Sequence, residues 1–269
     1  MIYIKRLIFL LFIVSSCQST GQLKIEARIT EELKEVSAAE FSKNSDLTWV
    51  IQDAGNANNL IGLNKNGHIV RNLYITNAEN RDWEDLTSDD YGNIYIGDFG
   101  NNNKKRKTFT IYKVNQEDLN ADTATAERIE FTMPKDQKPE DFESFFIFND
   151  SFYIFSKEHK KFVVLKVKNR AGKQIAKVHS KYNFKGKNNK ITSADISKDG
   201  KTIVLLNHDK LWELSKFKDD DFFSGDIREV EFEHNSQKEG ICFLTDSTVI
   251  ITDERKDFEG GYIYTFNLN

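Results

Sequence analysis

Two short stretches of the sequence combine residue types that could bind a metal ion or a sugar. Both read D-x-G-N-x-N, from Asp53 to Asn58 and from Asp98 to Asn103. Carboxylate and amide oxygens are the ligands that calcium and magnesium prefer. Asp, Asn and Gly are also favoured where strands end and tight turns begin, so the alternatives are ordinary hairpin loops or repeats of one structural unit.

The segments that carry these loops belong to an internal repeat. Five segments superpose as a short strand, a polar turn and an apolar strand, with first and last residues 14 positions apart in each. They run over residues 39–53, 84–98, 143–157, 193–207 and 239–253. A repeat of this length indicates a solenoid or a propeller.

Further strands complete each unit. The expected third strands are residues 60–63, 109–114, 162–167, 211–214 and 262–266, and the expected fourth strands are 69–75, 128–133, 176–184 and 227–233. The fifth unit has no fourth strand, whereas residues 23–29 form an unassigned strand near the start of the chain. Four-stranded units are typical of propeller blades, and an N-terminal strand commonly completes the last blade. The sequence therefore predicts an all-β, five-bladed β-propeller over residues 23–269, with six blades as the alternative if the long third unit contains a degenerate blade.

Propeller geometry brings the start of the first strand and the end of the second strand of each blade to one mouth of the central channel. This mouth would collect six carboxylates, together with Ser193 and Asn207 of the fourth unit. The predicted ligands of a calcium or magnesium ion are Glu84, Asp98, Glu143, Asn207, Glu239 and Asp253. Like charges that lie close together need a counter-ion or raise one another's pKa. A structural role, in which these carboxylates cap backbone amides, is the main alternative, and a catalytic role is a further one.

Five more residues are candidates for binding a small ligand at the same mouth. They are Asp53, Trp83, Asp85, Asn101 and His208. Trp83 could stack on a sugar or pack between blades, and His208 is the histidine that follows Asn207 at the mouth. The sequence contains no zinc motif, nucleotide-binding loop or nucleophile elbow. Cys242 lies in an apolar run and is expected to be a buried small hydrophobe.

The N-terminal segment predicts export and lipidation. Lys5 and Arg6 precede the apolar run 7–14, and the following Val14-Ser15-Ser16-Cys17 resembles the lipobox of bacterial lipoproteins. We expect a signal peptide over residues 1–16, a lipidated Cys17 with a tether over 17–22, and a location at the bacterial cell envelope, most simply the outer membrane. The net charge of −4 becomes −6 without the two basic signal residues, so nucleic acid is not an expected partner. The expected state is a monomer, with a membrane and a small molecule or protein as partners.

One stretch also resembles a known group of proteins. Asp82-Trp83-Glu84-Asp85-Leu86, followed by residues 93–102, is similar to the D-W-E-D and Y-I-G-D-x-G-x-N signature of bacterial secreted propeller proteins, many of them lipoproteins. More remotely, the chain is similar to the calcium-dependent propellers of gluconolactonases, senescence-marker lactonases and esterase-like phytases. That resemblance implies a divalent ion in the channel, held here by Glu84, Glu143, Asn207, Glu239 and Asp253. Ala39 and Lys157 stand where the pattern would have a carboxylate.

Two functions from different classes follow. The first is an envelope lipoprotein whose acidic mouth binds a divalent cation and a small ligand or glycan, with metal-assisted hydrolysis of an ester or lactone as its enzymatic form. The second is a non-catalytic scaffold that presents propeller faces to protein partners. A metal requirement for folding or activity would distinguish them.

Overall fold

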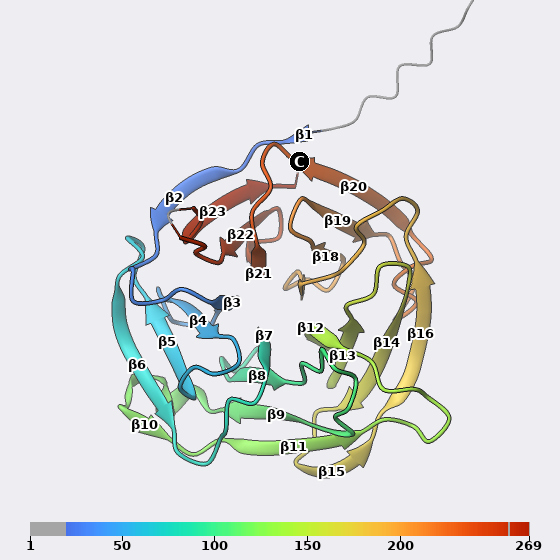
Figure 1. Ribbon diagram of the computed structural model, residues 1–269, viewed down its shortest axis with the longest axis horizontal. Coiled ribbons are helices and arrows are strands. Elements are labelled where there is room, and N and C mark those ends of the chain that lie inside the picture. The colour runs from blue at the N-terminus through green and yellow to red at the C-terminus, as the bar shows by residue number, and fades with distance from the viewer. Residues whose placement is uncertain (1–19, 258, 269) are drawn as a thin grey trace, which may run out of the picture.

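Five small sheets form a closed ring around a central channel (Figure 1). This computed structural model describes residues 20–257 and 259–268. The predicted signal segment and Cys17 lie outside the described residues. Within the described part of the chain, no helix is long and apolar enough to cross a membrane.

Each sheet is one blade with four main strands, numbered here from one to five along the chain. Blades one and two comprise β3 (Val36–Phe41), β4 (Thr48–Gln52), β5 (Asn59–Leu63) and β6 (Ile69–Ile75), then β7 (Trp83–Ser88), β8 (Ile94–Asp98), β9 (Thr108–Val114) and β11 (Glu127–Thr132). Blades three and four comprise β12 (Phe142–Phe148), β13 (Ser151–Ser156), β14 (Lys161–Lys168) and β16 (Lys177–Asn183), then β17 (Ser193–Ile196), β18 (Thr202–Leu206), β19 (Lys210–Ser215) and β20 (Asp226–Phe232). Blade five comprises β21 (Lys238–Thr245), β22 (Thr248–Asp253), β23 (Tyr262–Asn267) and the N-terminal β2 (Lys24–Arg28).

The N-terminal strand closes the ring. β2 pairs antiparallel with β23, so the fifth blade takes its outermost strand from the beginning of the chain. The five-bladed fold and this closure are confirmed. The third unit adds only the short strand β15 (Gly172–Ile175) to its four main strands, so its described residues contain no degenerate blade. The long interval after residue 84 is filled by the 3-10 helix η1 (Gln116–Asn120) and by β10 (Thr123–Ala124), and the described residues form no sixth sheet.

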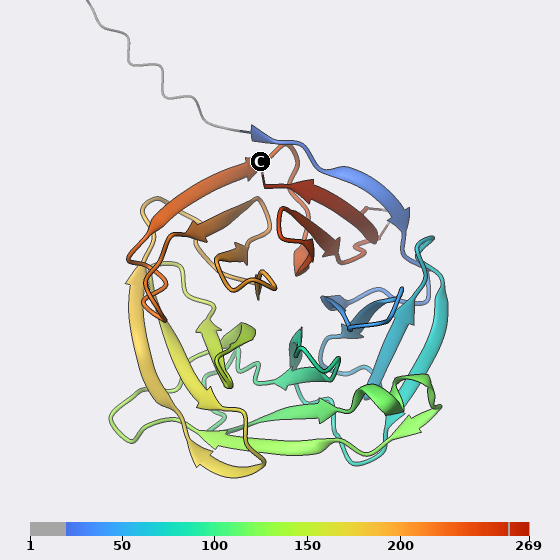
Figure 2. The same cartoon turned by 180° about the vertical axis from the view of Figure 1, so that it is seen from behind.

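Three short strands tie neighbouring blades together at the rim (Figure 2). β1 (Thr20–Gly21), β10 and β15 (Gly172–Ile175) each precede the outer strand of one blade and pair in parallel with the outer strand of the blade before it. These pairings cover the exposed edges of β20, β6 and β11, which would otherwise offer unpaired backbone groups to other chains.

The hydrophobic core lies between the blades. Five clusters of buried side chains each join two adjacent blades, including the pair of blades five and one. Strand side chains alternate between the two faces of a sheet, and both faces of a blade contact a neighbour, so inner strands such as β8 and β13 are buried along their whole length, whereas the outer strands β2, β16 and β20 are largely exposed. Large aromatic residues dominate, as in the stacked pair Phe184 and Trp212, whose ring centroids lie 4.3 Å apart.

Candidate metal centre at the channel mouth

A β-bulge at the start of the innermost strand positions the acidic side chains of the mouth. The register shifts by one residue in β3, β7, β12 and β21, so a single extra residue stands in each bulge. These extra residues are Ser37, Glu84, Glu143 and Glu239. Bulges turn a side chain away from the regular alternation and are common beside functional sites. Glu84, Glu143 and Glu239 therefore occupy equivalent places, as their spacing predicted.

The alignment of blade one was wrong. Ser37, and not Ala39, is the counterpart of Glu84, because Ser37 is the extra residue in the bulge of blade one. The stretch from the bulge to the end of the second strand is also one residue longer in blade one than in blade two. Gln52 therefore matches Asp98 as the last residue of the second strand, and Asp53 is the residue that follows. Successive residues point to opposite faces, so this shift of one position decides which carboxylate faces the channel.

Three carboxylates come together on one side of the mouth. An oxygen of Asp53, one of Asp82 and one of Glu84 all lie within 4.8 Å of one another. Asp53 follows β4 of blade one, whereas Asp82 and Glu84 flank the first residue of β7 in blade two. Three hard oxygen donors converging from two blades fit calcium or magnesium. Asp82 belongs to the D-W-E-D stretch but was not among the predicted ligands, although the i, i+2 spacing of Asp82 and Glu84 could have indicated it.

The second D-x-G-N-x-N loop makes this convergence sterically feasible. A Cβ atom on Gly100 would lie 1.9 Å from Oε1 of Glu84 and 2.5 Å from Oδ2 of Asp82. Both carboxylates thus pack directly on the glycine backbone. The glycine of the first copy has a different role, since Gly55 has a φ of +88° in an open turn.

Charge at the cluster is poorly compensated. Burial raises the pKa of Asp82 to about 6, with the Asp53 carboxylate as the next cause. Burial also raises the pKa of Glu84 well above its usual range, and the carboxylates of Glu143, Asp53 and Asp82 add to the shift. A cation bound between these carboxylates would favour their ionised forms.

The nearby cations are paired with other acids. Nζ of Lys157 lies 2.8 Å from Oε2 of Glu143, and a guanidinium nitrogen of Arg106 lies 2.9 Å from Oδ1 of Asp98. Burial lowers the pKa of Lys157, but the carboxylates of Glu143 and Glu239 outweigh this effect, so the pKa of Lys157 is raised. Lys157 is therefore the internal counter-ion of the opposite side of the mouth.

The other predicted ligands do not belong to this group of three, although Asp98 accepts a hydrogen bond from the backbone N–H of Asp82 at 3.2 Å. Asp253 accepts hydrogen bonds from the backbone N–H of Tyr262 at 2.8 Å and the hydroxyl of Tyr264 at 2.9 Å, both in its own blade. Asn207 donates to the carbonyl of Lys190 and accepts from the backbone N–H of Asp209.

His208 and Glu239 form a pair at the mouth. Nε2 of His208 lies 2.8 Å from Oε1 of Glu239, a contact that the sequence did not predict although both residues were placed at the mouth. The other ring nitrogen is not used in this contact, and the side chain is 37% exposed. The pair can hold and move a proton beside the acidic cluster.

Asp85 lies deeper and is engaged entirely within the protein. Its two oxygens accept from the backbone N–H groups of Leu86, Phe145 and Ala194 and from the hydroxyl of Ser193, at 2.9 to 3.2 Å. These donors belong to blades two, three and four. The carboxylate thus links three blades inside the channel.

Trp83 and Asn101 also have structural surroundings. Trp83 is fully buried in the core cluster that joins blades one and two, which fits the alternative of an aromatic packed between blades, and its ring centroid lies 6.1 Å from that of Tyr112 in its own blade. Asn101 accepts from the backbone of Lys105 and Arg106 and donates to the carbonyl of Glu140. Its amide therefore shapes the loop that carries Gly100.

Comparison with known families adds a classification. The family model described as SdiA-regulated matches residues 15–216, which is more than half of the sequence. The chain belongs to the SdiA-regulated family. The match includes the D-W-E-D stretch and both D-x-G-N-x-N loops of this family member. No functionally curated protein matches the sequence.

Solved structures confirm the fold of this SdiA-regulated protein. It is similar to the PQQ-bound aldose sugar dehydrogenase of Streptomyces coelicolor, with a TM-score of 0.55, 8% identity, and 93% of this chain and 98% of that chain covered. It is also similar to a gluconolactonase of Xanthomonas campestris, with a TM-score of 0.52, 8% identity, and coverage of 94% and 99%. The remote likeness to gluconolactonase propellers is thus confirmed at the level of the fold.

Proposed function

We propose that this protein is a lipid-anchored propeller of the bacterial cell envelope that binds a divalent cation at its channel mouth and, with it, a small oxygen-rich ligand. The carrying observation is the convergence of Asp53, Asp82 and Glu84 from two blades, with the carboxylates of Asp82 and Glu84 packed on Gly100. Calcium is the better candidate, because a carboxylate cluster at a strand bulge tolerates its flexible coordination. Anchoring through Cys17 would keep the mouth near the membrane without a spanning segment.

The enzymatic form of this proposal is hydrolysis of an ester or lactone. A bound divalent cation would polarise the carbonyl oxygen of the substrate. Asp53, Asp82 and Glu84 would hold the cation, and the contact with Lys157 would fix the position of Glu143 beside it. His208, oriented by Glu239, would accept a proton from the attacking water and return it to the leaving oxygen.

Calorimetric titration tests the cation site directly. A fragment beginning at Gln18 lacks the lipidated cysteine and keeps every described strand. We expect it to bind calcium, with affinity lowered more than about tenfold in both Glu84→Gln and Asp82→Asn, since the number of charged ligands sets affinity. Asp90→Asn is the matched control, because Asp90 is an exposed acid in the same blade. Absence of binding by the folded wild-type fragment would overturn the proposal and favour a protein-interaction scaffold.

Two further measurements separate the parts of the proposal. Lactones and carboxylic esters are assayed with calcium present, and loss of turnover in His208→Gln with unchanged calcium affinity would support the hydrolase form. Binding without turnover would leave a cation-dependent binding protein. The anchor is tested by fractionation, where Cys17→Ser should move the full chain from the membrane to the soluble fraction.

A further inference from the structure

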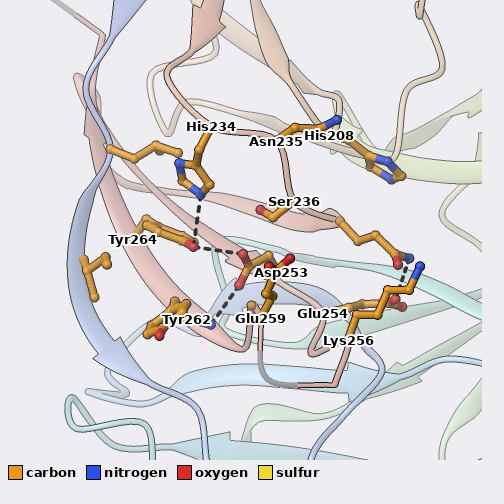
Figure 3. A pocket seen from close by; sticks show the side chains of 14 residues that line it. His208, His234, Asn235, Ser236, Asp253, Glu254, Lys256, Glu259, Tyr262 and Tyr264 are labelled. Carbon is orange, nitrogen blue, oxygen red and sulfur yellow. Dashed lines mark hydrogen bonds between the residues drawn. The ribbon is translucent and has the colours of Figure 1, made fainter.

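A second cavity, of about 770 Å³, opens beside the mouth in blade five. Figure 3 shows side chains from three segments around it: His208 after β18, residues 234–237 before β21, and the stretch from Asp253 to Tyr264. Ile25 of the outer strand β2, and Leu23 just before that strand, add to the wall. Pockets that bind small organic ligands have volumes in this range.

The aromatic wall of this pocket is held rigidly before any ligand arrives. Tyr264 donates its hydroxyl to Oδ2 of Asp253 at 2.9 Å, and Nε2 of His234 lies 3.3 Å from the same hydroxyl. The Tyr262 and Tyr264 ring centroids are 6.0 Å apart, and their planes are inclined by 56°. Ile25 is 58% exposed at the rim, so an apolar surface continues from the tyrosines to the entrance. Aromatic faces attract cations as well as apolar groups.

The polar wall is acidic. Asp253, Glu254 and Glu259 line the pocket with one ammonium, that of Lys256. Glu254 accepts a hydrogen bond from the amide of Gln237 at 2.8 Å, and burial followed by the carboxylates of Glu239 and Asp53 raises its pKa to about 8. A cationic group placed beside Glu254 would relieve this repulsion, whereas an anion would increase it.

The buried lysine behind this wall is hydrogen-bonded to neutral oxygens and not to the acids that line the pocket. Nζ of Lys238 donates to the carbonyls of His208 and His234 and to the hydroxyl of Ser236, at 2.9 to 3.1 Å. All three ammonium protons are thereby used within the protein. Burial lowers the pKa of this lysine to about 8, so its positive charge weakens at alkaline pH.

We propose that this pocket binds an organic ammonium group, with the cation beside Glu254 and the aliphatic or ring body of the ligand against Tyr262, Leu23 and Ile25. The same chemistry is offered by a free amine and by the lysyl side chain of a peptide. The site differs from the proposed cation site in its residues, since none of Asp53, Asp82 and Glu84 lines it.

Calorimetry with paired probes tests this inference. The fragment beginning at Gln18 is titrated with 1,5-diaminopentane and with its uncharged analogue 1,5-pentanediol at about pH 8.5, where the amine is still protonated and Glu254 is largely ionised. We expect saturable binding of the diamine alone, weakened about tenfold in Glu254→Gln and in Tyr262→Leu. Glu231→Gln, an exposed acid on β20, is the control that should leave the affinity unchanged. Circular dichroism confirms that each variant is folded.

The outcomes are distinct. Equal binding of diamine and diol, unchanged affinity in Glu254→Gln, or no saturable binding of the diamine would each overturn the proposal. Tighter binding of acetyl-glycyl-lysyl-glycinamide than of the diamine would assign the lysyl side chain of a protein, and the reverse order would assign a free amine. Glu84→Gln should retain diamine binding, so a failure of the metal proposal and a failure of this one can be told apart.

Discussion

Removal of the Asp85 carboxylate should destabilise the ring more than removal of any exposed acid. Its oxygens accept four hydrogen bonds, and the side chain is fully buried. Burial raises its pKa well above the usual range, while the four donors act in the opposite direction. Truncation to alanine would leave those donors facing a small cavity between three blades.

The expected cost follows from the donors that lose their partner. The Ser193 hydroxyl can rotate toward another acceptor, but the N–H groups of Leu86, Phe145 and Ala194 are fixed by their strands. Each buried N–H that is left without an acceptor lowers the free energy of unfolding by about 1 to 3 kcal/mol. A water molecule that enters the cavity would recover part of this loss. We therefore expect Asp85→Ala to lower the free energy of unfolding by about 3 to 5 kcal/mol. Asp85→Asn preserves the volume and one acceptor oxygen, so about 2 kcal/mol is expected.

Urea unfolding of the fragment beginning at Gln18, followed by tryptophan fluorescence and by circular dichroism, measures these differences. Asp90→Ala, which removes an exposed carboxylate five residues along the chain, should change the free energy of unfolding by less than about 0.5 kcal/mol. If the free energy of unfolding of Asp85→Ala lies within about 1 kcal/mol of the wild-type value, the link between blades contributes little to stability, and the reasoning is refuted.

Further predictions concern the mouth. Because the pKa of Asp82 is raised to about 6, calcium affinity should fall as the pH is lowered through 6, and calcium binding should release a proton. Calorimetry in buffers of different ionisation enthalpy would measure this proton release. The same raised pKa stabilises the metal-free fold below about pH 4, and this contribution to stability is lost as the pH rises through 6. Added calcium should therefore raise the melting temperature more at pH 8 than at pH 5. Lys157→Met removes the internal counter-ion and should increase calcium affinity about tenfold while lowering metal-free stability; unchanged affinity would separate Lys157 from the site. Gly100→Ala should cost about 1 to 3 kcal/mol of stability and most of the calcium affinity, because its methyl group would overlap Glu84; a neutral result in both assays would contradict the packing described.

The fold could be read from the sequence because its determinants are local and repeated. Alternation of apolar residues fixes a strand, and a strand of this kind recurs with the same turn in five units. The fourth strand at 69–75 was predicted with the bounds that the structure has, and the N-terminal strand was matched to the incomplete last blade. The spacing between Glu84, Glu143 and Glu239 and their strands likewise sufficed to place all three at the mouth.

Which carboxylates converge was decided only by the tertiary structure. A hairpin one residue longer in blade one brings Asp53, and not the last strand residue, toward the cluster, and such a change of register reverses the direction of a side chain. The partners of the acids also come from other segments or other blades: Arg106 forms an ion pair with Asp98, and Ser193 of blade four donates a hydrogen bond to Asp85 of blade two. The sequence by itself therefore determined the ring and the acidity of its mouth, because these depend on composition and period. The cluster of Asp53, Asp82 and Glu84 depends on register, bulges and long-range pairing, which are set only when the blades pack together.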